Sequence, residues 1–253
     1  MSEARLVTIA MSHYCEKARW VLDATGIPYR EEAHAPVAHL FATRPAGGKT
    51  VPLLVHDGRV FGDSTEIARY AESLARKERR LVPEEPEAQA RVLAMEEELD
   101  ETIGIDARLL AYWFELKDRE RARALVARMM RLRSPLAQRV VAPLFRTLIF
   151  RKYRVSEHAA ELAIARVRAT FARLGKTLET SDYLVGDRFT LADLTFAALA
   201  SPMLAPPEHP ITGRAAVTPA PEVAALRAEL AAMPAGRHVL RVYREHRGVA
   251  GVV

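Results

Sequence analysis

The chain has 253 residues, of which 49% are apolar and 27% charged, enough for a buried core in one large domain or two ordinary ones. Its single cysteine excludes an internal disulfide and a zinc site built on several thiolates. The net charge of +5 is concentrated in residues 119–154, which hold eleven Lys or Arg and one acid, so the charge does not indicate a general nucleic-acid binder.

The N-terminal residues carry no basic patch followed by a long apolar run. No stretch of the chain approaches the roughly eighteen uninterrupted apolar residues of a membrane-spanning helix. We therefore expect a soluble, cytoplasmic protein without a secretory signal.

The first 80 residues alternate patterns that are typical of strands and helices. Strands are predicted at 5–10, 28–33, 50–55 and 59–61. Between the first two strands, residues 15–25 carry apolar side chains at helical spacing and are followed by Gly26, a typical helix terminator. After the fourth strand, Asp63 or Ser64 caps another helix. The order βαβ followed by ββα predicts a small α/β domain over residues 1–80.

The rest of the chain follows a linker at residues 81–87 and is predicted to be mostly helical. Apolar side chains recur every three or four positions over residues 160–178, which marks a core-facing helix. Thr190 and Asp193 have the spacing of an acidic capping box at the start of a later helix. We therefore expect an all-helical domain over residues 88–253.

The tetrapeptide Ser12-His13-Tyr14-Cys15 joins the first predicted strand to the first helix. Such a junction presents unpaired backbone N–H groups and the positive end of the helix dipole, which together favour an anion. A thiolate held there has a lowered pKa. Ser12 is the first polar side chain after the strand, and its hydroxyl can donate a hydrogen bond to that sulfur. The turn is therefore a candidate site for thiolate chemistry.

Three segments, in this order along the chain, are similar to the cytosolic glutathione transferase superfamily. SHYCEKARWVLDATGIPY resembles its first helix with the active-site turn, TVPLLVHDGRVFGDSTEIARYAE its cis-proline and acid–Ser segment, and LVGDRFTLADLTFAA the capping box of its helical domain. The likeness covers residues 5–75 and 157–245. It implies a thioredoxin-like βαβ-ββα domain followed by an all-helical domain.

The resemblance also implies which residues bind glutathione. Pro52 would be the cis-proline, which leaves the backbone of Val51 to pair with the cysteinyl part of the ligand. Lys49 is placed to meet the glycyl carboxylate. Asp63 and Ser64 occupy the positions of the acid–Ser pair that holds the γ-glutamyl group, although the family more often has Glu at the first of these.

By the same resemblance, the catalytic residue is Ser12, where serine-type members hold the hydroxyl that stabilises the glutathione thiolate. Tyr14 and the pair Tyr112-Trp113 are placed by analogy where they can face the electrophile. The implied activity is that of a glutathione transferase, in which the thiolate attacks a small electrophile. Glutathione would be the co-substrate, without a metal or a nucleotide, and members of the family are commonly homodimers.

Two alternatives stay open. Cys15 could form a mixed disulfide with glutathione and give thiol-disulfide reductase activity, although a free cysteine is more often a small buried apolar residue. Ser12 stands where the cysteine-type members of the family have their reactive residue, which argues against this alternative. The other is a non-catalytic binding or membrane-associated protein that has kept the fold, in which Ser12 and Asp63 serve as helix caps alone.

A basic insertion at about 117–156 makes the helical domain longer than is usual in the family. It alternates arginines with apolar residues, and the default interpretation is a solvated helical face over a buried stripe. The second interpretation is an amphipathic element that touches an anionic membrane surface. Contact with an acidic partner, or with nucleic acid, which we do not expect, is the third.

Overall fold

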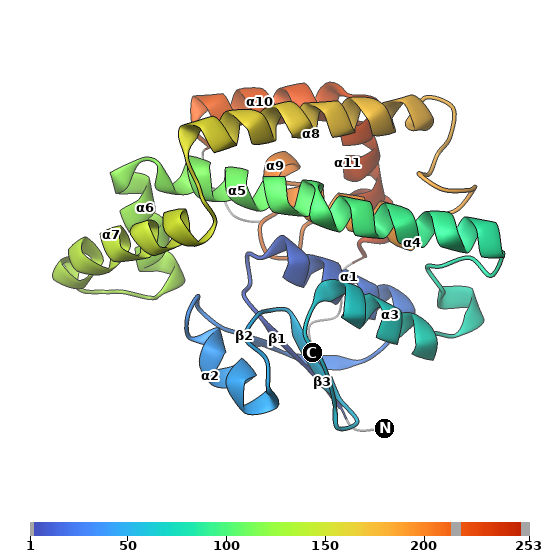
Figure 1. Cartoon of the computed structure of the whole chain (residues 1–253), viewed down its shortest axis with the longest axis horizontal. Helices are drawn as coiled ribbons and strands as arrows, with labels where there is room; N and C mark the ends of the chain where they lie inside the picture. Colours follow the sequence, from blue (N-terminus) through green and yellow to red (C-terminus); the bar gives the residue numbers. More distant parts are fainter. Residues whose placement is uncertain (1–2, 214–218, 249–253) are drawn as a thin grey trace.

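The structure is a computed structural model that describes residues 3–213 and 219–248 of the chain. It has an N-terminal four-stranded mixed sheet with helices, followed by an all-helical region (Figure 1). The fold class predicted from the sequence, thioredoxin-like and then all-helical, is therefore confirmed.

The sheet consists of β1 (Ala4–Thr8), β2 (Tyr29–Ala33), β3 (Leu53–His56) and β4 (Arg59–Phe61). Their order across the sheet is β2-β1-β3-β4. β1 pairs in parallel with β2 and antiparallel with β3, and β3 pairs antiparallel with β4. Consequently β1 and β4 end at the same edge of the sheet, and β3 begins there.

Two helices start at this edge. α1 (His13–Thr25) follows β1 and is terminated by Gly26, whose φ of 75° lies in the left-handed region that glycine adopts without a Cβ clash. α3 (Ser64–Leu74) follows β4. The remaining short elements are α2 (His39–Thr43), the 3-10 helix η1 (Arg44–Ala46) and the 3-10 helix η2 (Lys77–Arg79).

The helical region follows. Its described helices are α4 (Pro86–Glu101), α5 (Ile103–Leu116), α6 (Arg119–Met129), α7 (Pro135–Lys152), α8 (Glu157–Leu178), α9 (Leu191–Leu204), α10 (Pro221–Ala232) and α11 (Pro234–His246). The predicted stripe over residues 160–178 lies in α8. The capping box is confirmed at the start of α9, where the carboxylate of Asp193 accepts from the backbone N–H of Thr190 at 3.0 Å.

One apolar core runs through the sheet and the helical region. Its centre is α9, nearly all of whose side chains are buried, and α1, α4, α5 and α11 pack around it. Trp20 of α1 is 1% exposed, and its ring lies 4.7 Å from that of Tyr243 in α11. α1 is thus packed against the helices of the second region as well as against α3.

The basic insertion, whose structure the sequence left open, forms α6 and α7. Asp118 and Ser134 cap these helices by accepting from backbone N–H groups at 2.8 and 3.4 Å. The two helices pack on each other and on α5 around a second, smaller core, and they lie at one side of the molecule (Figure 1). Among the described helices, none combines the length and the hydropathy needed to cross a bilayer.

A buried ion-pair cluster ties α1 to α4. Lys17 is fully buried, and its Nζ contacts the carboxylates of Glu96 and, at 2.6 Å, of Asp100, both on α4. Thr65 of α3 joins the cluster by donating a hydrogen bond to Glu96 at 2.7 Å. Because a buried charge without a partner is strongly destabilising, the cluster fixes α1, α3 and α4 relative to one another.

Candidate functional site

The residues predicted to bind the ligand come from three loops at one edge of the sheet. Ser12 lies between β1 and α1, Pro52 directly precedes β3, and Asp63 lies between β4 and α3. These positions share the edge at which β1 and β4 end and β3 begins. The Val51–Pro52 peptide bond is cis, as the family resemblance implies. The fold thus brings the three segments together, although they are far apart in the sequence.

Ser12 is the N-cap of α1. Its Oγ accepts from the backbone N–H of Cys15 at 3.4 Å. The N–H groups of His13 and Tyr14 have no acceptor within the helix, because the amides of the first turn have no preceding carbonyl to bond. The Ser12 side chain is only half-buried, and a hydroxyl that accepts one hydrogen bond can still donate its own proton. This N-terminus can therefore hold an anion with the hydroxyl and the free amides as donors.

Cys15, the alternative nucleophile, is enclosed by the protein. Its side chain is 0% exposed and forms no disulfide. Burial raises the pKa of the Cys15 thiol, and the charge of Arg19 and the hydrogen bond with Ser12 oppose this effect without reversing it. A buried, protonated thiol is inert as a nucleophile. The geometry therefore favours Cys15 as a small buried apolar residue.

His13 anchors the start of α1 to α5. Its Nε2 lies 2.8 Å from the carbonyl oxygen of Gly104. Burial lowers the pKa of His13 to about 4; the bond to Gly104 opposes this shift, whereas the positive charges of Arg108 and Lys17 add to it. The imidazole is neutral at pH 7, so the bond to the carbonyl requires the proton to be on Nε2.

Tyr14 anchors the same turn to α4. Its hydroxyl donates to the carbonyl oxygen of Asp100 at 3.1 Å, and burial raises the pKa of Tyr14, so the phenol stays protonated. The ring also lies close to α5, where a Cβ built at Gly104 would be 2.4 Å from the Tyr14 hydroxyl oxygen. Only glycine at position 104 allows this approach without a shift of the tyrosine.

Asp63 is the N-cap of α3, which decides between the two caps that the sequence left open. One carboxylate oxygen accepts from the N–H of Glu66 at 2.8 Å. The other makes no hydrogen bond to the described residues, and the side chain is exposed. Ser64, the first residue of the helix, is buried. An exposed carboxylate with a free oxygen can bind an ammonium group while it also caps the helix.

Lys49 lines a cavity of about 410 Å³ beside η1. The cavity is lined by Leu40, Arg44, Gly47, Gly48 and Lys49. The cationic side chains of Arg44 and Lys49 are both exposed. The sequence pointed to Lys49 but missed Arg44, whose only signal was its place just before the proline and glycines of the turn. Two cationic side chains at one cavity favour a carboxylate ligand.

Arg108 of α5 lies against two tyrosine rings. Its guanidinium carbon is 5.5 Å from the ring centroid of Tyr14 and 4.8 Å from that of Tyr153, at the end of α7. Tyr153 stacks on Tyr112 with ring centroids 5.1 Å apart. Among the residues that the structure describes, no carboxylate forms an ion pair with Arg108. A guanidinium flanked by aromatic rings and without a counter-ion is suited to an anionic or strongly polar ligand group.

Of the three aromatic residues predicted to face the electrophile, the structure groups two. Tyr14 and Tyr112 share the neighbourhood of Arg108, whereas the ring of Trp113 lies 6.3 Å from that of Phe150 and under the Nζ of Lys117. Sequence reasoning missed Arg108 and Tyr153. Nothing in the sequence shows that the chain returns to α5 after the basic insertion.

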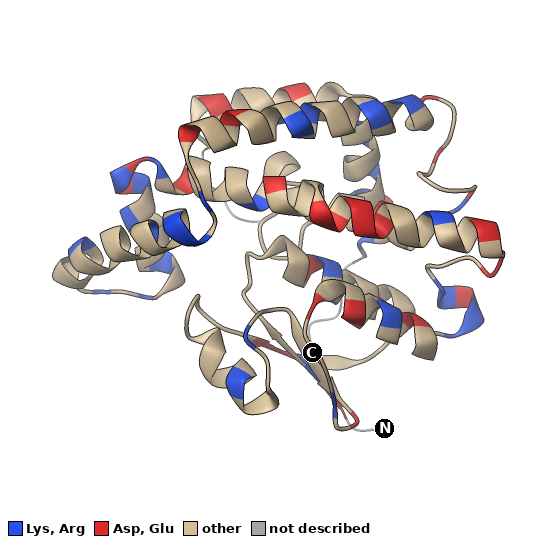
Figure 2. Cartoon of the chain, viewed as in Figure 1, with Lys and Arg blue, Asp and Glu red and all other residues tan. Residues whose placement is uncertain are grey.

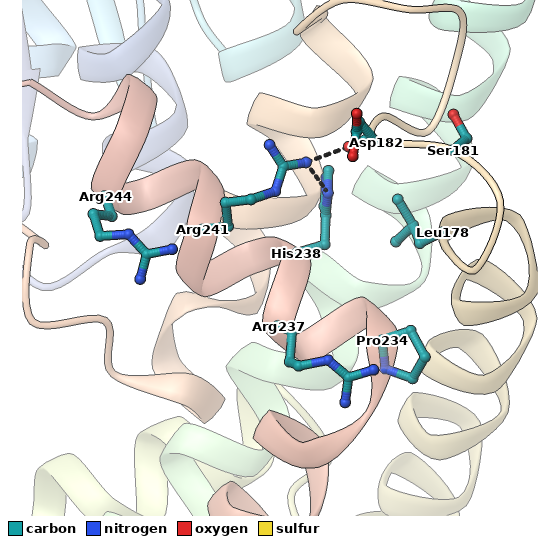
Figure 3. A pocket seen from close by; sticks show the side chains of 8 residues that line it. All are labelled: Leu178, Ser181, Asp182, Pro234, Arg237, His238, Arg241 and Arg244. Atoms are coloured by element: carbon teal, nitrogen blue, oxygen red, sulfur yellow. Dashed lines mark hydrogen bonds between the residues drawn. The ribbon is translucent and has the colours of Figure 1, made fainter.

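A second cavity, of about 260 Å³, lies within the helical region (Figure 3). It is lined by Leu178, Ser181, Asp182, Pro234, Arg237, His238, Arg241 and Arg244, none of which is a predicted site residue. Arg237 donates to the carbonyl of Ala232, and Arg241 pairs with Glu245 at 2.9 Å, so two of its three arginines are already engaged. Within the described ranges, no group of three His, Cys, Asp or Glu residues could hold a metal ion.

Two family profiles match the chain. The glutathione S-transferase N-terminal domain matches residues 6–79, and the glutathione S-transferase C-terminal domain matches residues 137–234. A search of curated proteins finds no match.

Several solved structures resemble this chain in fold at low sequence identity. The β-etherase LigF from Sphingobium sp. strain SYK-6 is 21% identical with a TM-score of 0.61, over 95% of this chain and 99% of that one. A theta class glutathione S-transferase from Xanthomonas axonopodis pv. citri, with glutathione bound, is 19% identical with a TM-score of 0.56, over 99% of each chain. FzlA from C. crescentus is 17% identical with a TM-score of 0.53, over 95% of this chain and 92% of that one. At these identities the likeness shows the fold alone.

Because the His13 imidazole is buried, we expect the free energy of unfolding to depend on pH in the acid range. The pKa of His13 is about 4 in the folded protein and about 6.5 in the unfolded chain, so the unfolded chain binds more protons between these values. The free energy of unfolding should therefore fall as the pH drops from 6.5 to 4, by about 3 kcal/mol for this group. Urea titrations of the wild type and of His13→Gln over this range should show a shallower fall in the variant.

His158→Gln is the control for this experiment, because His158 is 80% exposed. It should lose stability with acid as the wild type does. If the free energy of unfolding fell by the same amount in the wild type and in His13→Gln, the His13 imidazole would not be held neutral in the folded protein.

Proposed function

The chain belongs to the glutathione S-transferase superfamily, and on that premise we propose that it is a glutathione transferase whose protein-stabilised glutathione thiolate attacks a small electrophile. The observation that carries this proposal is the N-terminus of α1, where a half-buried Ser12 hydroxyl and two free amides meet at the edge of the sheet. A glutathione thiolate placed there receives hydrogen bonds from all three donors.

Thiolate stabilisation by Ser12 is worth a shift of one to two pKa units. A hydrogen bond to a charged group contributes about 1.5–3 kcal/mol, and one pKa unit corresponds to about 1.4 kcal/mol. The dipole of α1 adds to this effect because its positive end faces the sulfur. In the reaction, the thiolate sulfur forms a bond to the electrophilic carbon, and the leaving group departs with the electron pair of the bond that breaks.

For glutathione itself, we propose a site along residues 1–80. Lys49, with Arg44 beside it, binds the glycyl carboxylate in the cavity next to η1. The backbone of Val51, before the cis Pro52, pairs with the cysteinyl part. Asp63 and Ser64 hold the γ-glutamyl ammonium and carboxylate at the start of α3, where the helix dipole favours the carboxylate. Support comes from the theta class relative of the same fold, which was crystallised with glutathione.

For the electrophile, we propose the surface formed by Tyr14, Arg108, Tyr112 and Tyr153, because Tyr14 belongs to the same turn as Ser12 and Arg108 lies against the Tyr14 ring. Stacked rings favour an aromatic acceptor. The unpaired guanidinium favours an acceptor with a carboxylate, carbonyl or nitro group, whose developing negative charge it can stabilise.

The reductase alternative loses support from the burial of Cys15, since a mixed disulfide requires a sulfur that glutathione can reach. The non-catalytic alternative stays a prediction. Membrane contact through α6 and α7 would not by itself favour it, because these helices contain none of the residues proposed to bind glutathione. We further propose, from family membership, a homodimer in the cytoplasm that uses glutathione without a metal or nucleotide cofactor.

Ser12→Ala should lower kcat/KM for the conjugation of glutathione with a chlorodinitrobenzene by about 10- to 100-fold, because one charge-assisted hydrogen bond in the transition state is lost. Ser134→Ala is the matched control, since Ser134 caps α7 with the same 3.4 Å geometry. Cys15→Ala should stay within about threefold of the wild type, as expected for a residue that makes no transition-state contact. Equal losses in the two serine variants, or a loss in Cys15→Ala alone, would refute the assignment.

Asp63→Ala should weaken glutathione binding, measured by calorimetry, by about 10-fold or more, because the ligand's ammonium loses a charged partner. The change also removes a helix cap, which costs about 1 kcal/mol of stability. Asp118→Ala removes a cap of the same kind from α6, where the Asp118 carboxylate accepts from the backbone N–H of Arg121 at 2.8 Å. Similar affinities in the two variants would place the γ-glutamyl site elsewhere.

A further inference from the structure

The outward side of α7 carries an apolar stripe that no described element covers. It consists of Leu136, Val140, Leu144 and Leu148, which are 72%, 53%, 66% and 53% exposed. The four residues are spaced by four positions, so they form one row along the helix of about 18 Å. We call this row the α7 face. Large apolar side chains exposed singly are normal on a protein surface, but a contiguous row marks an interaction surface.

The exposure of the α7 face does not mean that α7 is poorly packed, because the opposite side of the helix is buried. Ala142, Phe145 and Ile149 point into the small core that α7 shares with α6 and the end of α5. That core is separate from the main core, and α6 and α7 extend to the side of the molecule (Figure 1). The helix therefore has two apolar sides, one satisfied within the protein and one facing out.

The surroundings of the α7 face are strongly basic. Residues 121–156 contain no acidic residue (Figure 2). Exposed cations lie before, along and after α7: Arg128, Arg131, Arg133, Arg139, Arg151, Lys152 and Arg154. Within the described part of the chain, none of these seven forms an ion pair with a carboxylate. Their charges are thus available to an external anionic partner.

The apolar α7 face and its basic surroundings together indicate which kind of partner can bind there. A second copy of the chain seated on the same face would bring two clusters of unpaired cations together, which costs energy. A purely solvated face would have no need of a large apolar side chain at every fourth position. A partner with an apolar interior and a negatively charged surface layer would match both the exposed apolar row and the unpaired cations around it.

We propose that the α7 face docks on an anionic phospholipid surface, with α7 parallel to the membrane plane. The row of leucines and valine enters the boundary between headgroups and acyl chains, and the flanking arginines meet lipid phosphates. The attachment is peripheral and reversible. α7, which carries the α7 face, ends next to Tyr153, and the Tyr153 ring lies against Arg108 of α5, so the α7 face and the proposed electrophile surface are linked through α7.

Vesicle co-sedimentation of the full chain tests the proposal. The protein should pellet with vesicles of equal parts phosphatidylcholine and phosphatidylglycerol, and stay in solution with vesicles of phosphatidylcholine alone. Raising NaCl from about 0.05 M to about 0.5 M should release most of it, because the Debye length shrinks severalfold. Equal binding to both kinds of vesicle, or binding to neither, would overturn the proposal.

Paired variants locate the surface. Leu136→Ser with Leu144→Ser should weaken binding to the anionic vesicles at least about tenfold. The control pair is Leu74→Ser with Leu162→Ser, leucines that are 44% and 46% exposed on α3 and α8, and it should bind as the wild type does. Circular dichroism and glutathione affinity, which the α7 substitutions should leave unchanged, show that each variant is folded.

Charge variants separate lipid from other partners. Arg139→Gln with Arg151→Gln should weaken vesicle binding about tenfold or more. The control pair, Arg91→Gln with Arg244→Gln, removes the same number of positive charges from α4 and α11 and should not weaken it. If the α7 variants change the oligomeric state in gel filtration but not vesicle binding, the face is a subunit contact and the proposal is wrong. Binding to RNA or to polyglutamate without binding to vesicles contradicts it equally.

Discussion

Buried polar contacts hold the start of α1 against α4 and α5, and the candidate site depends on them. Lys17 forms its ion pairs with α4, His13 reaches the carbonyl of Gly104, and Tyr14 reaches that of Asp100. Each of these groups is costly to bury without its partner. Because the partners lie in the helical region, the sheet cannot shift against that region without leaving a buried charge and two polar side chains unsatisfied. The N-terminus of α1 is therefore fixed in place before any ligand arrives.

The same anchoring places the four residues of the Ser12–Cys15 turn in different environments. His13 and Tyr14 are directed at α5 and α4, and Cys15 is packed inside the protein. Ser12, as the N-cap, keeps a partly exposed hydroxyl beside the amides of the first turn. The N-cap position of α1 carries a hydroxyl rather than a thiol. This arrangement supports our proposal that the turn stabilises an external sulfur, rather than supplying the attacking sulfur itself.

Local sequence patterns predicted the features that local physics controls. Strands, caps and the glycine after α1 follow from residue propensities and backbone geometry, and the capping box at Thr190 and Asp193 follows from its spacing. The choice between Asp63 and Ser64 as the cap needed the structure, since both residue types can cap a helix. Arg108 was not predicted because its partners are distant from it in the sequence: Tyr14 lies in α1 and Tyr153 directly follows α7. Such pairings are set by helix packing, which a periodic pattern does not encode.

The ionisation of glutathione on the protein is the most direct test of this account. The thiolate absorbs in the ultraviolet, so a pH titration of the complex gives the pKa of the bound thiol. A free thiol titrates at about 8.5, and the account predicts a value about one to two units lower on the wild type and on Ser134→Ala. On Ser12→Ala the value should return most of the way to that of free glutathione. A bound thiol that titrates as it does in buffer, or a lowered pKa that survives the loss of Ser12, would contradict the account.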